Sequence, residues 1–386
     1  MSLVQGYDRL LIDYKITHCL NHCVFCHMGD EVRNTTPVPF AKLKSIVGKL
    51  VEWKKTNAPA DFKMFIVSGT WDHDDIVEII KLDKRVRDSS EGSGVMLGGM
   101  KHRTESDMLK WLESIKAAGA GWVGMTFWGP QELHDSWCGR RGEYDFNVMA
   151  ARLAAKIGLS RRESVLLTKS SIPNLDELME MLDAIPGPKK RCIFPLNYGG
   201  RAKKLEHERL TKAEFEALPD RITKDLRTAD LKTEKEWMKF IKQEWDPSQI
   251  TRIMRLPVDK SNVDKLIAMT ASEILTFLRN KHDQLYQAVP DFQDISQKYG
   301  NPFNDKIYSL LDVDTLWSES YFRDNPKPDL PELKNRPFLS IKKIIDYEKL
   351  TVAMKLLDEL DFQMFSLFSN SLLHRGLTGP DKGFIS

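Results

Sequence analysis

The stretch Ile16-Thr-His-Cys19-Leu-Asn-His-Cys23-Val-Phe-Cys26 decides how the rest of the chain is interpreted. It follows a strand candidate that begins at Leu10, and it spaces three cysteines as Cys-x3-Cys-x2-Cys. Three thiolates on one tight loop can bind three corners of a cubane iron–sulfur cluster. The fourth iron then keeps an open position, which can bind a substrate or cofactor and pass it an electron. The spacing predicts a [4Fe–4S] site with Cys19, Cys23 and Cys26 as its ligands.

Two other interpretations of this loop stay open at this point. Cysteines of a structural core would be scattered among apolar residues, whereas these three stand among polar ones. A zinc site would need a fourth ligand at suitable spacing, and three histidines can offer one: His18, His22 and His27. We expect these histidines to surround the site rather than to ligate it.

Composition narrows the class of protein. The 386 residues are 41% hydrophobic and carry a net charge of +2, which argues against a nucleic-acid partner. Neither a membrane-spanning apolar run nor a signal-peptide pattern is found, so we expect a cytoplasmic protein and no membrane partner. Five cysteines, three of them within eight positions, make a poor disulfide framework and favour a metal site.

Short apolar runs alternate with helical patterns up to about residue 205. The strand candidates are Leu10–Ile16, Phe62–Val67, Gly94–Leu97, Trp122–Phe127, Ser164–Thr168 and Cys192–Leu196, and the helix candidates are Phe40–Trp53, Asp107–Ala118 and Leu175–Ile185. This alternation predicts an α/β fold with a parallel sheet, a partial (β/α)6 TIM-like barrel whose site lies at the carboxyl ends of the strands.

The later part of the chain reads as a mostly helical region. Helical patterns cover Val263–Leu278 and Ile341–Leu360, and a proline-containing loop precedes the second. We therefore expect two parts, a barrel over residues 1–225 that holds the cluster site and a helix-rich region over 226–386. The second part would act as a substrate lid or as a partner surface.

With these residues in view, the sequence resembles the radical S-adenosylmethionine (SAM) superfamily over about residues 8–215. Cys19, Cys23 and Cys26 match the family's CxxxCxxC motif, with the aromatic Phe25 before the third cysteine. The resemblance implies a cluster that reductively cleaves SAM and a 5′-deoxyadenosyl radical that abstracts a hydrogen atom from a substrate. It also implies an external electron donor of the flavodoxin or ferredoxin type.

The same resemblance implies a set of SAM-binding residues. The segment Ser68-Gly69-Thr70-Trp71-Asp72 looks like the family's Gly-Gly-Glu segment, although the usual glutamate is missing. The segment from Gly129 to Phe146 resembles that of the subfamily that carries a C-terminal SPASM domain, and it suggests Arg140, with Arg141 as second choice, for the SAM carboxylate. The expected cofactor-binding set is Phe25, Ser68, Gly69, Thr70, Asp72, Thr126, Arg140 and Thr168.

The chain departs from that subfamily because it has no cysteine after Cys192. We therefore expect a single cluster and a redox-neutral outcome such as epimerisation, rearrangement or elimination. The substrate would be a peptide or a small natural-product molecule. Cys138 is a candidate hydrogen donor to a substrate radical, with a buried structural cysteine as the plainer account.

Two alternatives from other classes stay open. One is an iron–sulfur protein that transfers electrons or senses redox state without SAM chemistry. The other is a zinc-bound interaction or nucleic-acid module. Several polar residues near expected strand ends are candidates for substrate contacts or for structural roles: His102, Arg103, His134, Asn197 and Tyr198.

Overall fold

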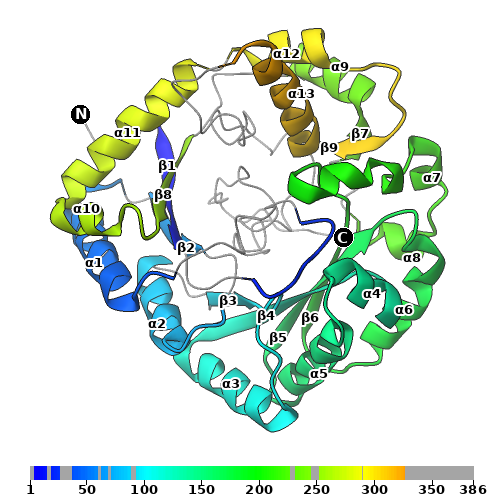
Figure 1. The fold of residues 1–386 in the computed structure, drawn as a ribbon, viewed down its shortest axis with the longest axis horizontal. Coiled ribbons are helices and arrows are strands. Elements are labelled where there is room, and N and C mark those ends of the chain that lie inside the picture. The colour runs from blue at the N-terminus through cyan, green and yellow to red at the C-terminus, as the bar shows by residue number, and fades with distance from the viewer. Residues whose placement is uncertain are drawn as a thin grey trace, which may run out of the picture.

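A computed structural model gives the fold of the chain (Figure 1). The structure describes residues 4–14, 19–26, 37–59, 62–67, 71–87, 93–226, 231–244, 252–288 and 290–326. The expected helix Ile341–Leu360 lies outside these residues.

Seven parallel strands form two sheets. They are β1 (Tyr7–Tyr14), β2 (Lys63–Val67), β3 (Ser93–Met96), β4 (Ala120–Phe127), β5 (Ser160–Leu167), β6 (Lys189–Pro195) and β8 (Arg252–Val258). One sheet has the order β2-β1-β8 and the other the order β3-β4-β5-β6, with parallel pairing throughout. The predicted α/β class with parallel strands is confirmed, in the form of an open barrel whose described strands do not close into one sheet.

Helices cover the outer side of these strands (Figure 1). The longer ones are α1 (Phe40–Asn57), α2 (Ile76–Arg87), α3 (Glu105–Ala118), α4 (Gln131–Cys138), α5 (Glu143–Lys156) and α6 (Leu175–Asp183). Shorter helices elsewhere in this part of the chain are η1 (Ile172–Asn174), η2 (Gly200–Glu208), α7 (Lys212–Glu216) and α8 (Asp220–Thr223). The packing follows from helical spacing, as in α1, which buries Leu43, Ile46, Val47 and Leu50 against the sheet.

Local chemistry sets the helix ends. The hydroxyl of Thr104 accepts a hydrogen bond from the Asp107 N–H and so caps the start of α3. The same helix ends at Gly119, whose φ of 106° is readily adopted only by glycine. The three helices expected from the sequence are confirmed as α1, α3 and α6, with small shifts at their ends.

Strand β8 was not expected from the sequence. It lies beyond residue 226, yet it pairs with β1 along most of its length, for example Leu11 with Arg255. Arg255 Nη2 lies 2.8 Å from Asp13 Oδ2, so an ion pair adds to this pairing. Pro257 is atypical of a strand, so the sequence pattern does not indicate β8. The structure tolerates this proline because β8 lies at the edge of its sheet. The division at residues 225 and 226 stays a prediction.

The described residues beyond 230 are mostly helical, as expected. The helices are α9 (Glu234–Glu244), α10 (Val263–Ala268), α11 (Ala271–Gln287), α12 (Phe292–Tyr299) and α13 (Leu310–Asp324), joined by an antiparallel pair of short strands, β7 (Leu231–Thr233) and β9 (Ile307–Ser309). The single expected helix Val263–Leu278 is two helices, because Thr270 and Glu273 form a capping box that starts α11.

A second hydrophobic core holds part of this region together. It is built around Trp237, Phe292 and Trp317, from α9, α12 and α13. In the described part of the chain, no helix is both long enough and apolar enough to cross a membrane.

Candidate functional site

The cysteine loop, residues 19–26, is held by backbone hydrogen bonds to segments that follow three different strands. Leu20 N–H donates to the carbonyl oxygen of Gly99 after β3, with an N···O distance of 3.0 Å. After β4, the carbonyls of Cys138 and Trp137 accept from His22 N–H and Val24 N–H at 2.7 and 2.9 Å.

The far end of the loop is held in the same way. Arg201 N–H, at the start of η2 after β6, donates to the carbonyl oxygen of Cys26 at 2.9 Å. The loop therefore crosses the carboxyl ends of the strands, where active sites of parallel α/β folds lie, and Figure 1 shows it in dark blue at the inner side of the ring of elements.

Two glycines allow the cysteine loop to lie close to the segments that follow β3 and β4. A Cβ atom on Gly99 would lie 2.1 Å from Cys19 Sγ, and a Cβ on Gly139 would lie 2.7 Å from His22 Cβ. Both glycines also have positive φ, 75° and 60°, which side chains disfavour. Close approach and backbone conformation together require glycine at these two positions.

The three cysteines of the loop are free thiols, and each is partly buried. Burial, followed by the nearby charge of Cys23, raises the pKa of Cys19 to about 12, and Cys26 adds to the effect. Cys19 is thus within electrostatic range of both other cysteines of the loop. A thiol in such a place stays protonated at neutral pH unless a positive group offsets the thiolate charge.

The chemistry of the three thiol donors suits an iron–sulfur cluster. Within the described ranges, no three His, Cys, Asp or Glu side chains group as ligands of a single metal ion. A cubane takes one thiolate at each iron corner, so its ligands need not converge on one point. Three thiols on one loop therefore fit a [4Fe–4S] cluster with one iron left open.

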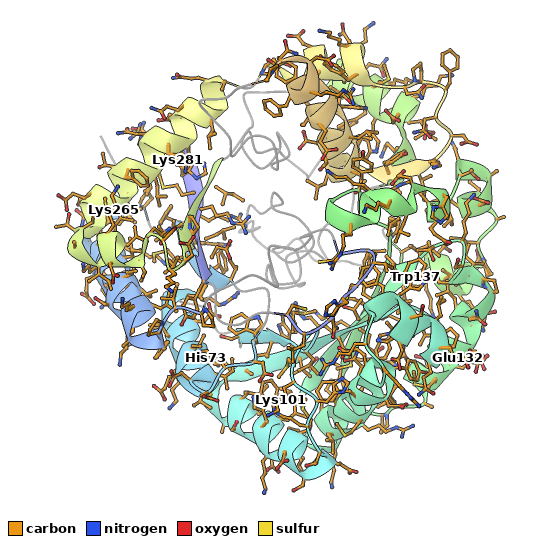
Figure 2. All side chains as sticks on the ribbon, viewed as in Figure 1. His73, Lys101, Glu132, Trp137, Lys265 and Lys281 are labelled. Carbon is orange, nitrogen blue, oxygen red and sulfur yellow. The ribbon has the colours of Figure 1, made fainter. Side chains whose placement is uncertain are left out.

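Aromatic side chains of neighbouring segments pack against Phe25 of the cysteine loop. The ring centroid of Phe25 lies 3.5 Å from that of Trp128 and 6.0 Å from that of Trp137. These rings belong to an apolar cluster that also includes Cys23 and Cys138. Figure 2 shows Trp137 on the side of α4 toward the centre of the ring. Phe25, expected to contact the cofactor, packs against these two rings, and its contact with the cofactor stays a prediction.

A buried carboxylate ties the cysteine loop to two other segments. Glu143 is 1% exposed, and its Oε1 accepts a hydrogen bond from Asn21 Nδ2 at 2.9 Å. Its Oε2 lies 2.9 Å from His102 Nε2 and 3.3 Å from Arg140 Nη1. Burial alone would raise the pKa of Glu143, but the hydrogen bonds from His102 and Asn21 and the charge of Arg140 outweigh it and lower the pKa.

Arg140, predicted to bind the SAM carboxylate, is part of this network. Its Nη1 also donates to the carbonyl oxygen of Met100 at 2.5 Å and to Asn21 Oδ1 at 3.3 Å. All the side-chain hydrogen bonds of Arg140 to described residues use Nη1, which leaves Nε and Nη2 for another partner. Arg141, the second choice, is exposed to solvent.

The other predicted cofactor-binding residues have the following places. Asp72 accepts a hydrogen bond from Lys101 N–H at 2.6 Å and pairs with Arg103, whose guanidinium lies over the Trp111 ring. Thr126 is half-buried near the end of β4.

Thr168 is buried after β5, where its hydroxyl accepts from Ser171 N–H at 3.2 Å. Ser68, Gly69 and Thr70 lie outside the described residues. The structure therefore brings the cysteines and Arg140 together, whereas Asp72, His102, Arg103 and Thr168 already have protein partners.

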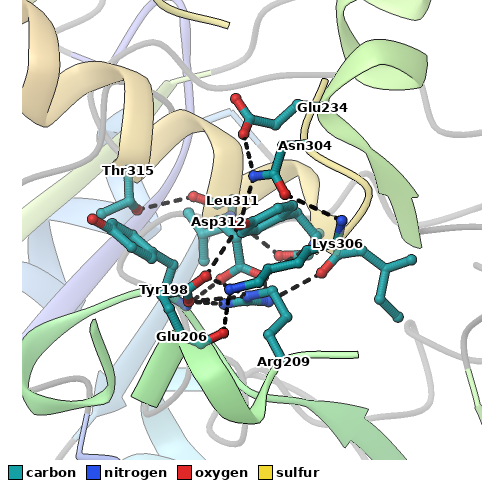
Figure 3. A network of polar contacts seen from close by, with 12 residues as sticks. Tyr198, Glu206, Arg209, Glu234, Asn304, Lys306, Leu311, Asp312 and Thr315 are labelled. Atoms are coloured by element: carbon teal, nitrogen blue, oxygen red, sulfur yellow. Dashed lines mark hydrogen bonds and ion pairs between the residues drawn. The ribbon is translucent and has the colours of Figure 1, made fainter. Parts of the chain in front are cut away.

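A polar network joins the end of β6 to the C-terminal region (Figure 3). Arg209, fully buried, lies 3.0 Å from Glu206 and 3.4 Å from Asp312 of α13. Asp312 also accepts from Tyr198 N–H at 2.6 Å, just after β6. Because η2 starts at the cysteine loop and ends at this network, it links the two.

Sequence reasoning missed Asn21, Gly99 and Glu143 as parts of the site. Gly99 follows the strand candidate Gly94–Leu97, and Glu143 lies within the segment from Gly129 to Phe146, but neither was assigned a role. None of the three residue types carries a signal for its function here, because the partners come from distant parts of the chain.

The fold and the site together define a parallel α/β protein with a three-cysteine loop across the carboxyl ends of its strands. No protein-family model matches the chain, and no curated protein does. Solved structures do match. SuiB of Streptococcus suis is 15% identical with a TM-score of 0.35, over 50% of this chain and 40% of that chain.

Two further solved structures show the range of similarity. Native anSMEcpe with bound AdoMet and Cp18Cys peptide is 13% identical with a TM-score of 0.45, over 85% of this chain and 98% of that one. Coproporphyrinogen III oxidase (HemN) from Escherichia coli, described as a radical SAM enzyme, is 14% identical with a TM-score of 0.36, over 66% and 64%.

The first four matches cover only 40% to 54% of the solved chains. TM-scores of this size carry no argument about function.

Proposed function

We propose that this chain is a radical SAM enzyme that holds one [4Fe–4S] cluster on Cys19, Cys23 and Cys26. The observation that carries the proposal is the cysteine loop itself. Three partly buried thiols lie on one loop, and backbone hydrogen bonds fix that loop across the carboxyl ends of the sheet. When bound there, the cluster supplies the electron that cleaves SAM to methionine and a 5′-deoxyadenosyl radical.

The protein's own contribution begins with rigidity. Gly99 and Gly139 let the loop lie directly on the segments after β3 and β4, and Glu143 holds Asn21 from behind. Donors that are fixed before the ligand binds need no reordering when it arrives, which favours binding. The loop is thus prepared to present three sulfurs in one arrangement.

Arg140 is the proposed partner of the SAM carboxylate. Glu143 and the Met100 carbonyl hold its Nη1, so its guanidinium has a fixed orientation next to the loop. The free edge formed by Nε and Nη2 suits a bidentate contact with a carboxylate. Asn21 extends the same network to the cysteine loop.

The proposed reaction is abstraction of a hydrogen atom from a peptide or a small natural-product molecule. A redox-neutral outcome fits the sequence, because no cysteine follows Cys192 to ligate a further cluster. The helix-rich region is proposed to cover the substrate, and the Arg209–Asp312 pair supports this by joining α13 to η2 beside the cysteine loop. An external flavodoxin or ferredoxin is proposed as the electron source.

Anaerobic reconstitution with iron and sulfide tests the proposal. We expect a brown protein with about four irons per chain that releases 5′-deoxyadenosine when given SAM and dithionite. Cys23→Ala should abolish this release, whereas Cys192→Ala, which removes a thiol in the middle of β6, should preserve it. Deuterated candidate peptides and sugars then identify the substrate by deuterium transfer into 5′-deoxyadenosine.

The same experiment separates the alternatives. A colourless protein that holds zinc would identify a zinc module and overturn the proposal. A brown protein that leaves SAM intact under strong reduction would instead identify an electron-transfer or redox-sensing protein.

A further inference from the structure

A pocket of about 210 Å³ lies beside β8, and none of the residues that line it belongs to the proposed cluster or SAM site. Its walls come from β8, α10, α11 and the turns that join them, and most are apolar, as with Leu266, Met269, Phe277 and Leu278. A single water takes up about 10–15 Å³ of such space, so a molecule of roughly ten non-hydrogen atoms has room here. Sites for small molecules have this form, an apolar hollow with a few polar groups.

The polar groups of the pocket are mainly basic. Four of them are Arg255, Lys265, Lys281 and His282, the fifth is Asn262, and none of the described lining residues is acidic. Lys265 and Lys281 come from neighbouring helices, α10 and α11 (Figure 2). Arg255 already has a carboxylate partner, because its Nη2 lies 2.8 Å from Asp13 Oδ2.

Lys265 has no carboxylate partner in the described part of the chain. Its Nζ lies 5.1 Å from the centre of the Phe277 ring, and this cation–π contact holds the ammonium group against a wall of the pocket. The adjacent acid, Asp264, instead pairs with Lys42 of α1 at 2.5 Å. The pocket therefore combines apolar walls with a positive charge that no described acid neutralises.

Hydrogen bonds fix the walls of the pocket. Asn262 Nδ2 donates to the Pro257 carbonyl oxygen at 2.9 Å, which holds the turn after β8. Lys49 Nζ of α1 donates to the Met269 carbonyl oxygen at 2.8 Å, which holds the turn between α10 and α11. His282 Nε2 accepts from the Arg255 backbone N–H at 3.2 Å and so ties α11 to β8. Because the cavity is formed in advance, a ligand loses little free energy to ordering its walls.

We propose that this pocket binds a small apolar molecule with one anionic group, such as a medium-chain carboxylate. The apolar walls accept the hydrocarbon body, since removal of apolar surface from water is favourable. Lys265 pairs with the carboxylate at the rim, where its ammonium group supplies the opposite charge. The inference needs no cluster, so it goes beyond the proposed function and does not depend on it.

Isothermal titration calorimetry of the full chain at low salt, with octanoate and with 1-octanol, tests the charge and the apolar body separately. Octanoate should bind one site per chain, roughly two- to fivefold more tightly than octanol, because an ion pair with an exposed lysine adds about that factor. Lys265→Met keeps an apolar stem without the charge, so octanoate should fall to the level of octanol and octanol should be unaffected. Lys260→Met, at an exposed lysine outside the pocket, is the matched control and should keep the preference.

A second variant tests the apolar wall. Phe277 is 44% exposed, so Phe277→Ala should leave the fold intact and weaken both ligands. Failure of both ligands to bind, equal affinities for the two, or a preference that survives in Lys265→Met would overturn the inference. Binding to vesicles of anionic lipid without binding of octanoate would identify a membrane surface and also overturn it. A chain that binds octanoate in this way but assembles no cluster overturns the enzyme proposal alone.

Discussion

The carboxylate of Glu143 accepts a hydrogen bond from the side-chain amide of Asn21 at 2.9 Å, although 122 positions separate the two residues. Asn21 lies between the first and second cysteines, and Glu143 is the first residue of α5. This contact adds a side-chain link to the backbone hydrogen bonds that connect the cysteine loop to the segment between β4 and β5. It also explains why a charged residue is buried behind the loop.

Replacing Glu143 should destabilise the fold. Glu143→Ala removes the carboxylate partner of Arg140 and the acceptor of the Asn21 side-chain N–H, so the free energy of unfolding should fall by about 3 kcal/mol. Urea denaturation measures this change. Glu132→Ala, at an exposed position of α4, should stay within about 0.5 kcal/mol of the wild type. Equal stability of the two variants would show that the buried network contributes little.

Gly99 should be essential for the cysteine loop but not for the fold as a whole. In Gly99→Ala the new Cβ would meet Cys19 Sγ, so we expect a large loss of iron after reconstitution. Gly98→Ala is a matched control, because its Cβ would meet nothing within 4 Å and its φ is not positive. Circular dichroism checks that both variants fold. Full iron content in Gly99→Ala would contradict the close contact.

Arg140 should affect SAM affinity more than Arg141. Loss of a hydrogen bond between charged groups costs about 1.5–3 kcal/mol, so Arg140→Ala should weaken SAM binding roughly 10- to 100-fold. Equilibrium dialysis of the reconstituted protein measures this affinity, with iron content as a check on the loop. Arg141→Ala serves as the exposed control. A stronger effect from Arg141→Ala would reassign the carboxylate contact.

Stability should fall on mild acidification because of His134. Burial lowers its pKa to about 4 in the folded protein, against an ordinary value of 6.5. Below pH 6.5 the unfolded chain takes up a proton that the folded chain does not, so the free energy of unfolding falls as the pH approaches 4. The loss of stability caused by His134 should reach about 3 kcal/mol near pH 4 and be absent above pH 6.5.

Denaturation of wild type and His134→Phe at about pH 7 and about pH 5 tests this dependence. The wild type should lose more stability between the two values than the variant does. Parallel losses would mean that His134 is not the group responsible.

The existence and order of the barrel strands could be predicted from the sequence more accurately than the residues at which each strand begins. The expected strands Ser164–Thr168 and Cys192–Leu196 begin earlier in the structure, at Ser160 and Lys189. The charged residues that open them do not look like strand residues. They are accommodated because Glu163 is fully buried between Arg161 and Arg191, at 3.2 and 2.8 Å. A pattern of single residues cannot reveal a pair made across two strands.

The candidate site could likewise be predicted only in part from the sequence. The spacing of Cys19, Cys23 and Cys26 was visible along the chain, because the three donors are neighbours in sequence. The groups that fix them were not, since Gly99, Trp137 and Cys138 act mainly through backbone atoms, which any residue type provides. Arg140 was singled out for a ligand, and its contacts with Glu143 and Met100 became evident only in three dimensions.

The pairing of β8 with β1 has a consequence for synthesis of the chain. During synthesis, one edge of β1 stays uncovered until residues 252–258 have been made. At roughly 5–20 residues per second, that wait lasts tens of seconds. A bare strand edge is a template for unwanted association between nascent chains, so production should depend on chaperones and on slow, cool expression.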